Sequence, residues 1–140
     1  LYNTERFDVR GKELLRLRSK YYVVDMAFKQ LLLPDINRDR GHVLENIVYL
    51  ELRRRGYTVY VGQLTKGEID FVAQKPGGLL EYYQVSESVL DPTIRDRELA
   101  LLEAVKDQYP KFLLTMDELY KPHNYNGIQQ CNVLDWLIGM

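Results

Sequence analysis

Apolar positions along this chain of 140 residues follow a helical spacing in one segment and strand-like patterns in most of the others. In residues 41–55 the apolar side chains fall on one arc of a helix with 3.6 residues per turn. They are Val43, Leu44, Ile47, Val48 and Leu50. The arginines at 53–55 suit the negative end of the helix dipole, and Gly56 suits a C-terminal cap. The pattern therefore predicts an amphipathic helix over residues 41–55.

The segments after this helix predict a run of strands that a second helix interrupts. Segments rich in β-branched and aromatic residues predict strands at 57–64, 68–75 and 79–86, and shorter apolar segments predict strands at 111–116 and 128–133. Asp91 followed by Pro92 predicts a capped start for a helix to about residue 108, and residues 134–138 predict a terminal helix. The order from residue 41 is α-β-β-β-α-β-β-α. We therefore expect an α/β fold with a mixed central sheet flanked by helices.

The first twenty residues differ in character from the rest of the chain. Residues 6–11 suggest a short strand and turn, and the stretch that follows is basic. We interpret residues 1–20 as the remnant of an upstream domain with a linker, and residues 21–140 as the domain itself. Residues 26–33 predict a helical turn or two. Because the sequence begins at Leu1 rather than at a methionine, we expect it to be a piece of a longer protein.

Composition and charge exclude several classes of protein. The 46% hydrophobic and 28% charged fractions are ordinary for a globular domain, and the net charge of −1 argues against a general electrostatic grip on nucleic acid. The single cysteine, Cys131, excludes an internal disulfide framework and fits a reducing compartment. No apolar segment approaches the ~20 residues that cross a bilayer. We therefore expect a cytoplasmic domain without membrane association, and local basic patches for DNA or RNA stay open.

Strand alternation brings polar side chains of two predicted strands together. In the strand over residues 68–75, Asp70 should lie on the face opposite Ile69 and Phe71. In the strand over residues 79–86, Gln84 should share a face with Ser86. If the two strands pair, Asp70 and Gln84 lie side by side.

Such a pair predicts a site for Mg²⁺, which binds oxygen ligands and keeps several of its waters. Asp70 would be the principal ligand, the amide oxygen of Gln84 a weak neutral one, and the backbone carbonyl of Val85 a third. Glu45 would act from the preceding helix, often through a water. The metal would then activate a water and stabilise charge on a phosphate.

A glutamate on a helix, an aspartate on a strand and an acidic-x-lysine on the next strand form the constellation of PD-(D/E)XK nucleases, which this chain resembles in part. Its third element is Gln84-x-Ser86. Ser86 lacks the positive charge that a lysine places beside the attacking water, and Gln84 removes one negative charge, which should lower the affinity for Mg²⁺. Lys66, four residues before Asp70 and of the same strand parity, is the candidate for the missing catalytic charge.

Each of these residues also has an ordinary structural explanation. Asp70 suits the polar edge of a half-buried strand, Glu45 suits the solvated margin of a helix, and the arginines at 53–55 suit a solvated helix end. Glu51 falls near the middle of the apolar arc, and a buried carboxylate needs a partner. Because the arginines at 53–55 are close along the helix, we expect that partner to be remote in sequence.

The motifs at residues 41–46, 68–73, 83–85 and 109–117, in this order, resemble restriction-endonuclease-like domains, including archaeal Holliday-junction resolvases. More closely, the chain resembles the C-terminal domain of unknown function that follows the ATPase core in a group of prokaryotic AAA-type ATPases. The resemblance implies a restriction-endonuclease-like core, and an upstream P-loop ATPase and winged-helix segment in the same polypeptide. No Gly-x-x-x-x-Gly-Lys-Ser/Thr motif occurs here, so we expect no ATP site in this fragment.

Three functions follow from the sequence. The leading hypothesis is an accessory nuclease-like domain of an ATPase that is catalytically impaired and engages nucleic acid or a partner. The first alternative is an active Mg²⁺-dependent nuclease in which Lys66 or a neighbour replaces the missing lysine. The second alternative is a protein-interaction module that regulates the ATPase. Basic residues around Asp70 and Gln84 would favour the first two, and an exposed apolar patch would favour the third.

Overall fold

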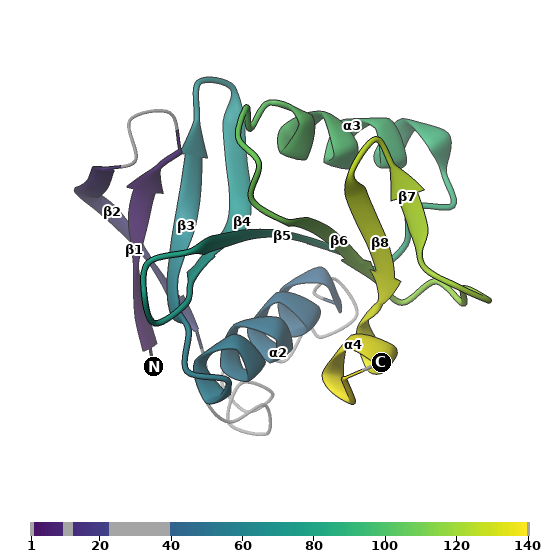
Figure 1. Ribbon diagram of the computed structural model, residues 1–140, viewed down its shortest axis with the longest axis horizontal. Coiled ribbons are helices and arrows are strands. Elements are labelled where there is room, and N and C mark those ends of the chain that lie inside the picture. The colour runs from purple at the N-terminus through teal and green to yellow at the C-terminus, as the bar shows by residue number, and fades with distance from the viewer. Residues whose placement is uncertain (1, 10–12, 23–39, 140) are drawn as a thin grey trace.

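A mixed sheet of eight strands forms the centre of the molecule, with α2 and α4 on one face and α3 on the other (Figure 1). The computed structural model describes residues 2–9, 13–22 and 40–139. Its elements are β1 (Tyr2–Asp8), β2 (Glu13–Tyr22), α2 (Arg40–Arg54), β3 (Thr58–Leu64), β4 (Gly67–Gln74), β5 (Leu80–Ser86), α3 (Pro92–Glu103), β6 (Lys111–Thr115), β7 (His123–Tyr125), β8 (Ile128–Asn132) and α4 (Val133–Leu137). The α/β fold class is therefore confirmed.

The strands lie in the order β2-β1-β3-β4-β5-β6-β8-β7. β3, β4 and β5 form an antiparallel meander, whereas β5, β6 and β8 run parallel to one another. Parallel neighbours need a crossover, and α3 makes it between β5 and β6. α3 begins where the sequence predicts, because Asp91 accepts a hydrogen bond from the Thr93 amide at 2.9 Å and Pro92 opens the first turn.

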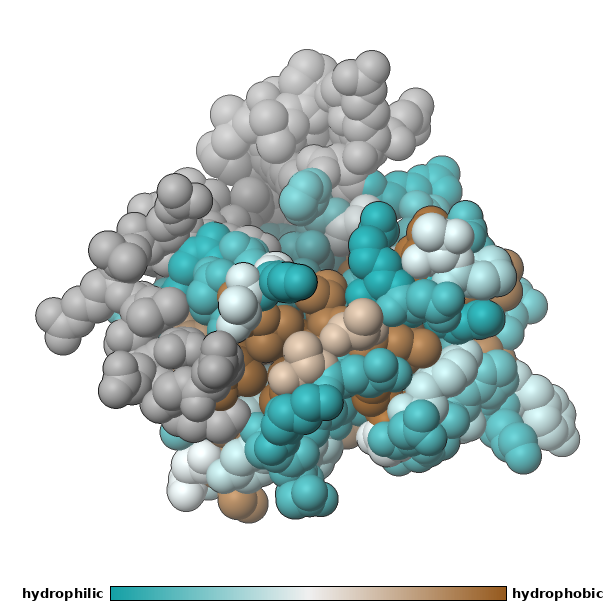
Figure 2. Space-filling view, turned by 90° about the horizontal axis from the view of Figure 1, so that it is seen from above, coloured by the Kyte–Doolittle hydropathy of each residue, from teal (hydrophilic) through white to brown (hydrophobic). Residues whose placement is uncertain are grey.

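Each face of the sheet has its own hydrophobic core. On one face, α2 and α4 pack on a cluster that includes Val48, Tyr49, Leu52, Phe71, Tyr83 and Trp136. On the other face, α3 packs on a cluster that includes Ile69, Val72, Tyr82, Leu99, Leu102 and Leu113. Figure 2 looks onto the α3 side and shows apolar atoms gathered between hydrophilic borders. None of the described helices is long and apolar enough to cross a membrane.

Most predicted elements are confirmed, with three differences. α3 ends at Glu103 rather than near residue 108, and a short strand, β7, was not predicted. β1 is hydrogen-bonded to β3 in the common sheet, and β2 continues that sheet at its edge. The division into an upstream remnant at residues 1–20 and a domain at residues 21–140 stays a prediction. The helical turn predicted at 26–33 lies outside the described residues.

A bulge between β3 and β4 overturns the alternation expected around Asp70. Tyr60 pairs with Val72 and Gly62 with Ile69, so two steps along β3 match three steps along β4. The extra residue on β4 shifts the side-chain parity. Ile69 consequently packs in the cluster under α3, whereas Phe71 packs in the cluster under α2. The prediction that these two side chains share a face is wrong.

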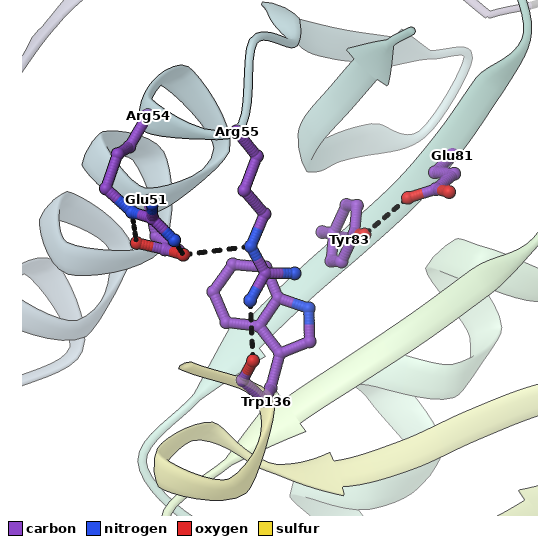
Figure 3. A network of polar contacts seen from close by, with 6 residues as sticks. All are labelled: Glu51, Arg54, Arg55, Glu81, Tyr83 and Trp136. Atoms are coloured by element: carbon purple, nitrogen blue, oxygen red, sulfur yellow. Dashed lines mark hydrogen bonds and ion pairs between the residues drawn. The ribbon is translucent and has the colours of Figure 1, made fainter. Parts of the chain in front are cut away.

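A polar network fastens α4 to α2, and it corrects the prediction for Glu51 (Figure 3). The carboxylate is only 12% exposed, as expected, but its partners are local: Arg54 at 2.6 Å and Arg55 at 2.9 Å. Residues three and four positions apart on a helix share one face, so Arg54 and Arg55 can both reach the Glu51 carboxylate. These two arginines hold the pKa of Glu51 at about 2, against an ordinary value of 4.5.

The guanidinium of Arg55 continues the network to the C-terminal helix. It donates to the backbone carbonyl of Trp136 at 2.6 Å and lies over the indole at 4.3 Å from the ring centroid. Nearby, Tyr83 donates its hydroxyl to Glu81 (Figure 3). Glu81 also forms an ion pair with Lys75 at 2.7 Å. Burial, and secondarily the Glu81 carboxylate, raises the pKa of Tyr83 well above its usual value. Glu51 and Glu81 are thus both neutralised by cations.

Candidate functional site

Asp70 and Gln84 lie opposite each other on the neighbouring strands β4 and β5. Phe71 pairs with Tyr83 in the antiparallel ladder, which puts Asp70 beside Gln84 at the next position. Gln84 Oε1 accepts a hydrogen bond from the Asp70 backbone amide at 3.0 Å. Asp70 Oδ2 in turn accepts one from the Val85 backbone amide at 2.8 Å. The expected pairing of these two residues is confirmed.

The bulge in β4 explains why a side chain serves the Asp70 amide. An extra residue in a strand leaves the ladder locally incomplete, and a buried backbone amide needs another acceptor. The Gln84 side chain, in a residue only 5% exposed, supplies that acceptor. The Gln84 side chain therefore takes the place of a backbone acceptor for the Asp70 amide.

A residue that the sequence did not single out completes the cluster. Glu98 of α3 accepts a hydrogen bond from Gln84 Nε2 at 2.7 Å, and its side chain is 13% exposed. The exposed Arg97 lies 3.8 Å from it. The carboxylate that the PD-(D/E)XK constellation expects at position 84 is thus one hydrogen bond away, on the helix. Gln84 is neutral, as the sequence indicates, and Glu98 brings a carboxylate to its amide.

A signal for Glu98 was present in the sequence. Ile94, Leu101 and Val105 stand at helical spacing from it, so Glu98 interrupts an apolar stripe at i, i+4, i+7 and i+11. A carboxylate in such a stripe faces the sheet and needs a buried partner. Glu98 therefore stands in α3 as Glu51 stands in α2, as a carboxylate within an apolar stripe.

The remaining predicted ligand is the backbone carbonyl of Val85, which lies on the side of β5 that faces β4. Val85 directs its N–H toward β4, where Asp70 accepts it. In an extended strand the N–H and C=O of one residue point to the same neighbour, so this carbonyl also faces β4. Ser86 follows on the face of Gln84 and donates its hydroxyl to the Ser88 carbonyl at 3.1 Å. Its neutral hydroxyl supplies no positive charge.

Glu45 and Lys66 are less closely tied to this cluster. Glu45 Oε2 lies 4.0 Å from His42 Nδ1 on α2, a helix that contacts both β4 and β5. α2 packs on the face of the sheet opposite α3, whose Glu98 contacts Gln84, so Glu45 comes from the other face, and its action through a water stays a prediction. Lys66 lies in the exposed turn between β3 and β4, not in a strand, so the parity argument for it is wrong. Four residues of extended chain span about 13 Å, which is a long reach from Lys66 to Asp70.

The oxygen donors gathered here are of the kind that suits Mg²⁺. They are the carboxylates of Asp70 and Glu98, the amide oxygen of Gln84 and the carbonyl of Val85. Across the described ranges, no three His, Cys, Asp or Glu side chains are grouped as metal ligands. The Gln84 oxygen accepts one hydrogen bond, from the Asp70 amide, and keeps a second lone pair for a cation.

Two curated relatives match this sequence. A protein from Haemophilus influenzae, named only as uncharacterized, is 37% identical over 137 residues, which are 98% of this chain and 33% of that protein. An uncharacterized protein from Methanocaldococcus jannaschii is 35% identical over 94 residues, which are 64% of this chain and 20% of that protein. No family model and no solved structure matches. The chain spans a third or less of the length of either relative.

Proposed function

We propose that this chain is an accessory domain of a larger prokaryotic, cytoplasmic AAA-type ATPase, with a restriction-endonuclease-like core that engages nucleic acid and is impaired in cleavage. The observation that carries the proposal is the joining of Asp70 and Gln84 across β4 and β5 by side-chain-to-backbone hydrogen bonds. It occurs on the α-β-β-β-α-β order of elements that a restriction-endonuclease-like core requires. The ATPase itself would lie upstream.

The absence of a cation at position 86 supports the impaired state. Cleavage of a phosphodiester needs positive charge beside the attacking water and the developing phosphorane. Position 86 offers a neutral hydroxyl, and the proposed substitute, Lys66, lies in a turn about 13 Å of chain away from Asp70. Mg²⁺ would supply Lewis-acid chemistry when bound, and the loss of the lysine typically costs about 10²–10³ in rate.

The lengths of the relatives fit a domain of a larger protein. This chain matches 33% of one relative and 20% of the other, so both have room for further domains. Sequencing the whole gene product for a P-loop ahead of Leu1 tests the ATPase part of the proposal. A full-length protein without one would overturn that part and leave the site untouched.

Binding and cleavage are tested separately on labelled duplex, single-stranded DNA and RNA. We expect binding at low salt that weakens as salt rises, and no cleavage with Mg²⁺ above background. Asp70→Asn, which keeps a hydrogen-bond acceptor, serves as the site variant, and Asp96→Asn on the exposed side of α3 serves as its control. Robust cleavage that Asp70→Ala abolishes would replace this proposal with the active nuclease.

Glu98 is the specific observation that favours this second candidate. With Asp70 it restores two carboxylates to the cluster, which an active Mg²⁺-dependent nuclease requires. For the third candidate, a protein-interaction module, Leu134 on α4 and Ile138 directly after it are 56% and 70% exposed. Failure to bind any nucleic acid would favour that module.

A further inference from the structure

The amide of Gln84 links the bulge of β4 to α3 through two hydrogen bonds. Its oxygen accepts from the Asp70 amide at 3.0 Å, and its nitrogen donates to Glu98 at 2.7 Å. A glutamine has one acceptor end and one donor end, so a flip of the amide would break both contacts. The orientation of Gln84 is therefore fixed by the two partners together.

Glu98 also determines which residue type fits at position 84. A glutamate there would still accept from the Asp70 amide, but its second oxygen would meet the Glu98 carboxylate at hydrogen-bond distance. Two carboxylates at that separation cannot both be ionised. A glutamine at 84 and a glutamate at 98 are thus a matched pair, which keeps one negative charge between them.

We propose that Glu98 is a positioning residue of the Asp70 site, which orients the Gln84 amide and carries the second negative charge that the site would otherwise hold on β5. The use of this charge to hold Mg²⁺ beside nucleic acid rests on the proposed function. The orientation of Gln84 does not, because it follows from the hydrogen bonds alone. Glu98 acts through Gln84, whose oxygen fixes the backbone at Asp70.

The first test follows the backbone amide of Asp70 by nuclear magnetic resonance and hydrogen exchange. Glu98→Ala removes the acceptor for Gln84, so the Asp70 amide should shift and lose about fivefold to tenfold in protection. Glu98→Gln retains a neutral acceptor and should leave that amide near its wild-type position. Glu103→Ala, at an exposed glutamate of α3, is the control. An Asp70 amide that responds to Glu98→Ala no more than to the control would overturn the proposal.

The second test exchanges the two residue types. Gln84→Glu should lower the equilibrium constant for folding at neutral pH by about tenfold or more, because two carboxylates then face each other. Adding Glu98→Gln reverses donor and acceptor and should recover most of that loss. If the contact only held α3 to the sheet and did not need one donor and one acceptor, the added Glu98→Gln substitution would not recover the stability. A Gln84→Glu variant as stable as the wild type would contradict the pairing.

The third test separates this inference from the proposed function. Binding of a labelled DNA duplex in Mg²⁺ should depend on the charge at Glu98, so Glu98→Gln should change it severalfold even though the Asp70 amide stays in place. If the amide and exchange tests succeed while no variant binds DNA, the proposed function fails and the positioning role stands. If DNA binding is present but identical in Glu98→Gln and wild type, the second charge is not used, and that part of the proposal is wrong.

Discussion

Glu51 on α2 and Glu98 on α3 have nearly equal exposed fractions, but they have different partners on the two faces of the sheet. Glu51 is 12% exposed and meets Arg54 and Arg55 at 2.6 and 2.9 Å. Glu98 is 13% exposed and meets the neutral amide of Gln84 at 2.7 Å, with Arg97 at 3.8 Å. Among the described residues, the first carboxylate is closely paired with two cations, whereas the second has its shortest contact with a neutral amide.

The difference separates a structural network from a site. A buried charge with close counter-charges fastens elements together, and here it joins α2 to α4. A buried carboxylate supported mainly by a neutral donor keeps its negative charge available to a ligand. We therefore expect substitutions on the α2 side to change stability, and substitutions on the α3 side to change binding and chemistry.

Trp136→Ala should produce the largest effect, and it tests the α2 side of the sheet. The indole is 7% exposed and packs edge-on against Tyr83 at 5.7 Å between centroids. Its truncation should lower the free energy of unfolding by about 3–5 kcal/mol, measured by urea denaturation. Leu134→Ala, at a residue of α4 that is 56% exposed, should stay within about 0.5 kcal/mol. Equal effects of the two substitutions would show that α4 is not held by its buried face.

Ser86→Lys tests the α3 side. If the proposed function is right and Glu98 serves as the second carboxylate, a lysine at position 86 should raise Mg²⁺-dependent plasmid cleavage by about 10²–10³. The Gln84→Glu change is not needed and should lower the gain, since it sets two carboxylates against each other. Asp70→Ala in the same background should remove the activity. Cleavage by Ser86→Lys that never exceeds the wild-type background would count against a nuclease-derived site.

Arg55→Ala should cost about 2 kcal/mol of unfolding free energy. The substitution removes the bond to Glu51, the bond to the Trp136 carbonyl and the stacking on the indole. Arg54→Ala is the matched control, because Arg54 bonds the same carboxylate but its side chain is 71% exposed. We expect a clearly smaller loss from the control. DNA binding should change in neither variant if the two faces are independent.

The pH dependence of stability should report Glu51. Its pKa in the folded state is about 2, below the ordinary 4.5, so folding favours the ionised form. The stabilisation is therefore complete above pH 4.5 and is lost as the pH falls from 4.5 toward 2. Glu51→Gln should be less stable than the wild type by about 1 kcal/mol at neutral pH. That gap should close across the acid range, and a gap that persists at pH 2 would contradict the arginine pairing.

The sequence predicted the elements of this fold better than their register. The extent of α2, the Asp91–Pro92 start of α3 and the three strands before it follow from local patterns, and the structure confirms them. The buried face of α2 is only partly the predicted arc, because Tyr49 and Leu52 are buried beside Leu44 and Val48. The bulge in β4 was not predictable, because it depends on how two strands match across a hairpin. That single extra residue placed Ile69 and Phe71 on opposite faces.

The site was predicted as far as strand neighbours allow. Asp70 and Gln84 belong to consecutive strands, so their pairing follows from a meander. Glu98 belongs to a crossover helix, and its contact with β5 depends on tertiary packing that strand alternation does not describe. The partners of Glu51 are predictable from helix geometry, because residues three and four positions along a helix share its face.

Lys66→Ala should have the smallest effect, and it tests a lysine that lies outside the contacts of both Glu51 and Glu98. Lys66 is exposed in the turn between β3 and β4, beside Leu64 and Ala104 at the far end of α3. Its charge is screened by solvent and is about 13 Å of chain from Asp70. We expect no measurable change in stability or in DNA cleavage with Mg²⁺, both in the wild type and in the Ser86→Lys background. A loss of cleavage in that background would return Lys66 to the catalytic role that its position argues against.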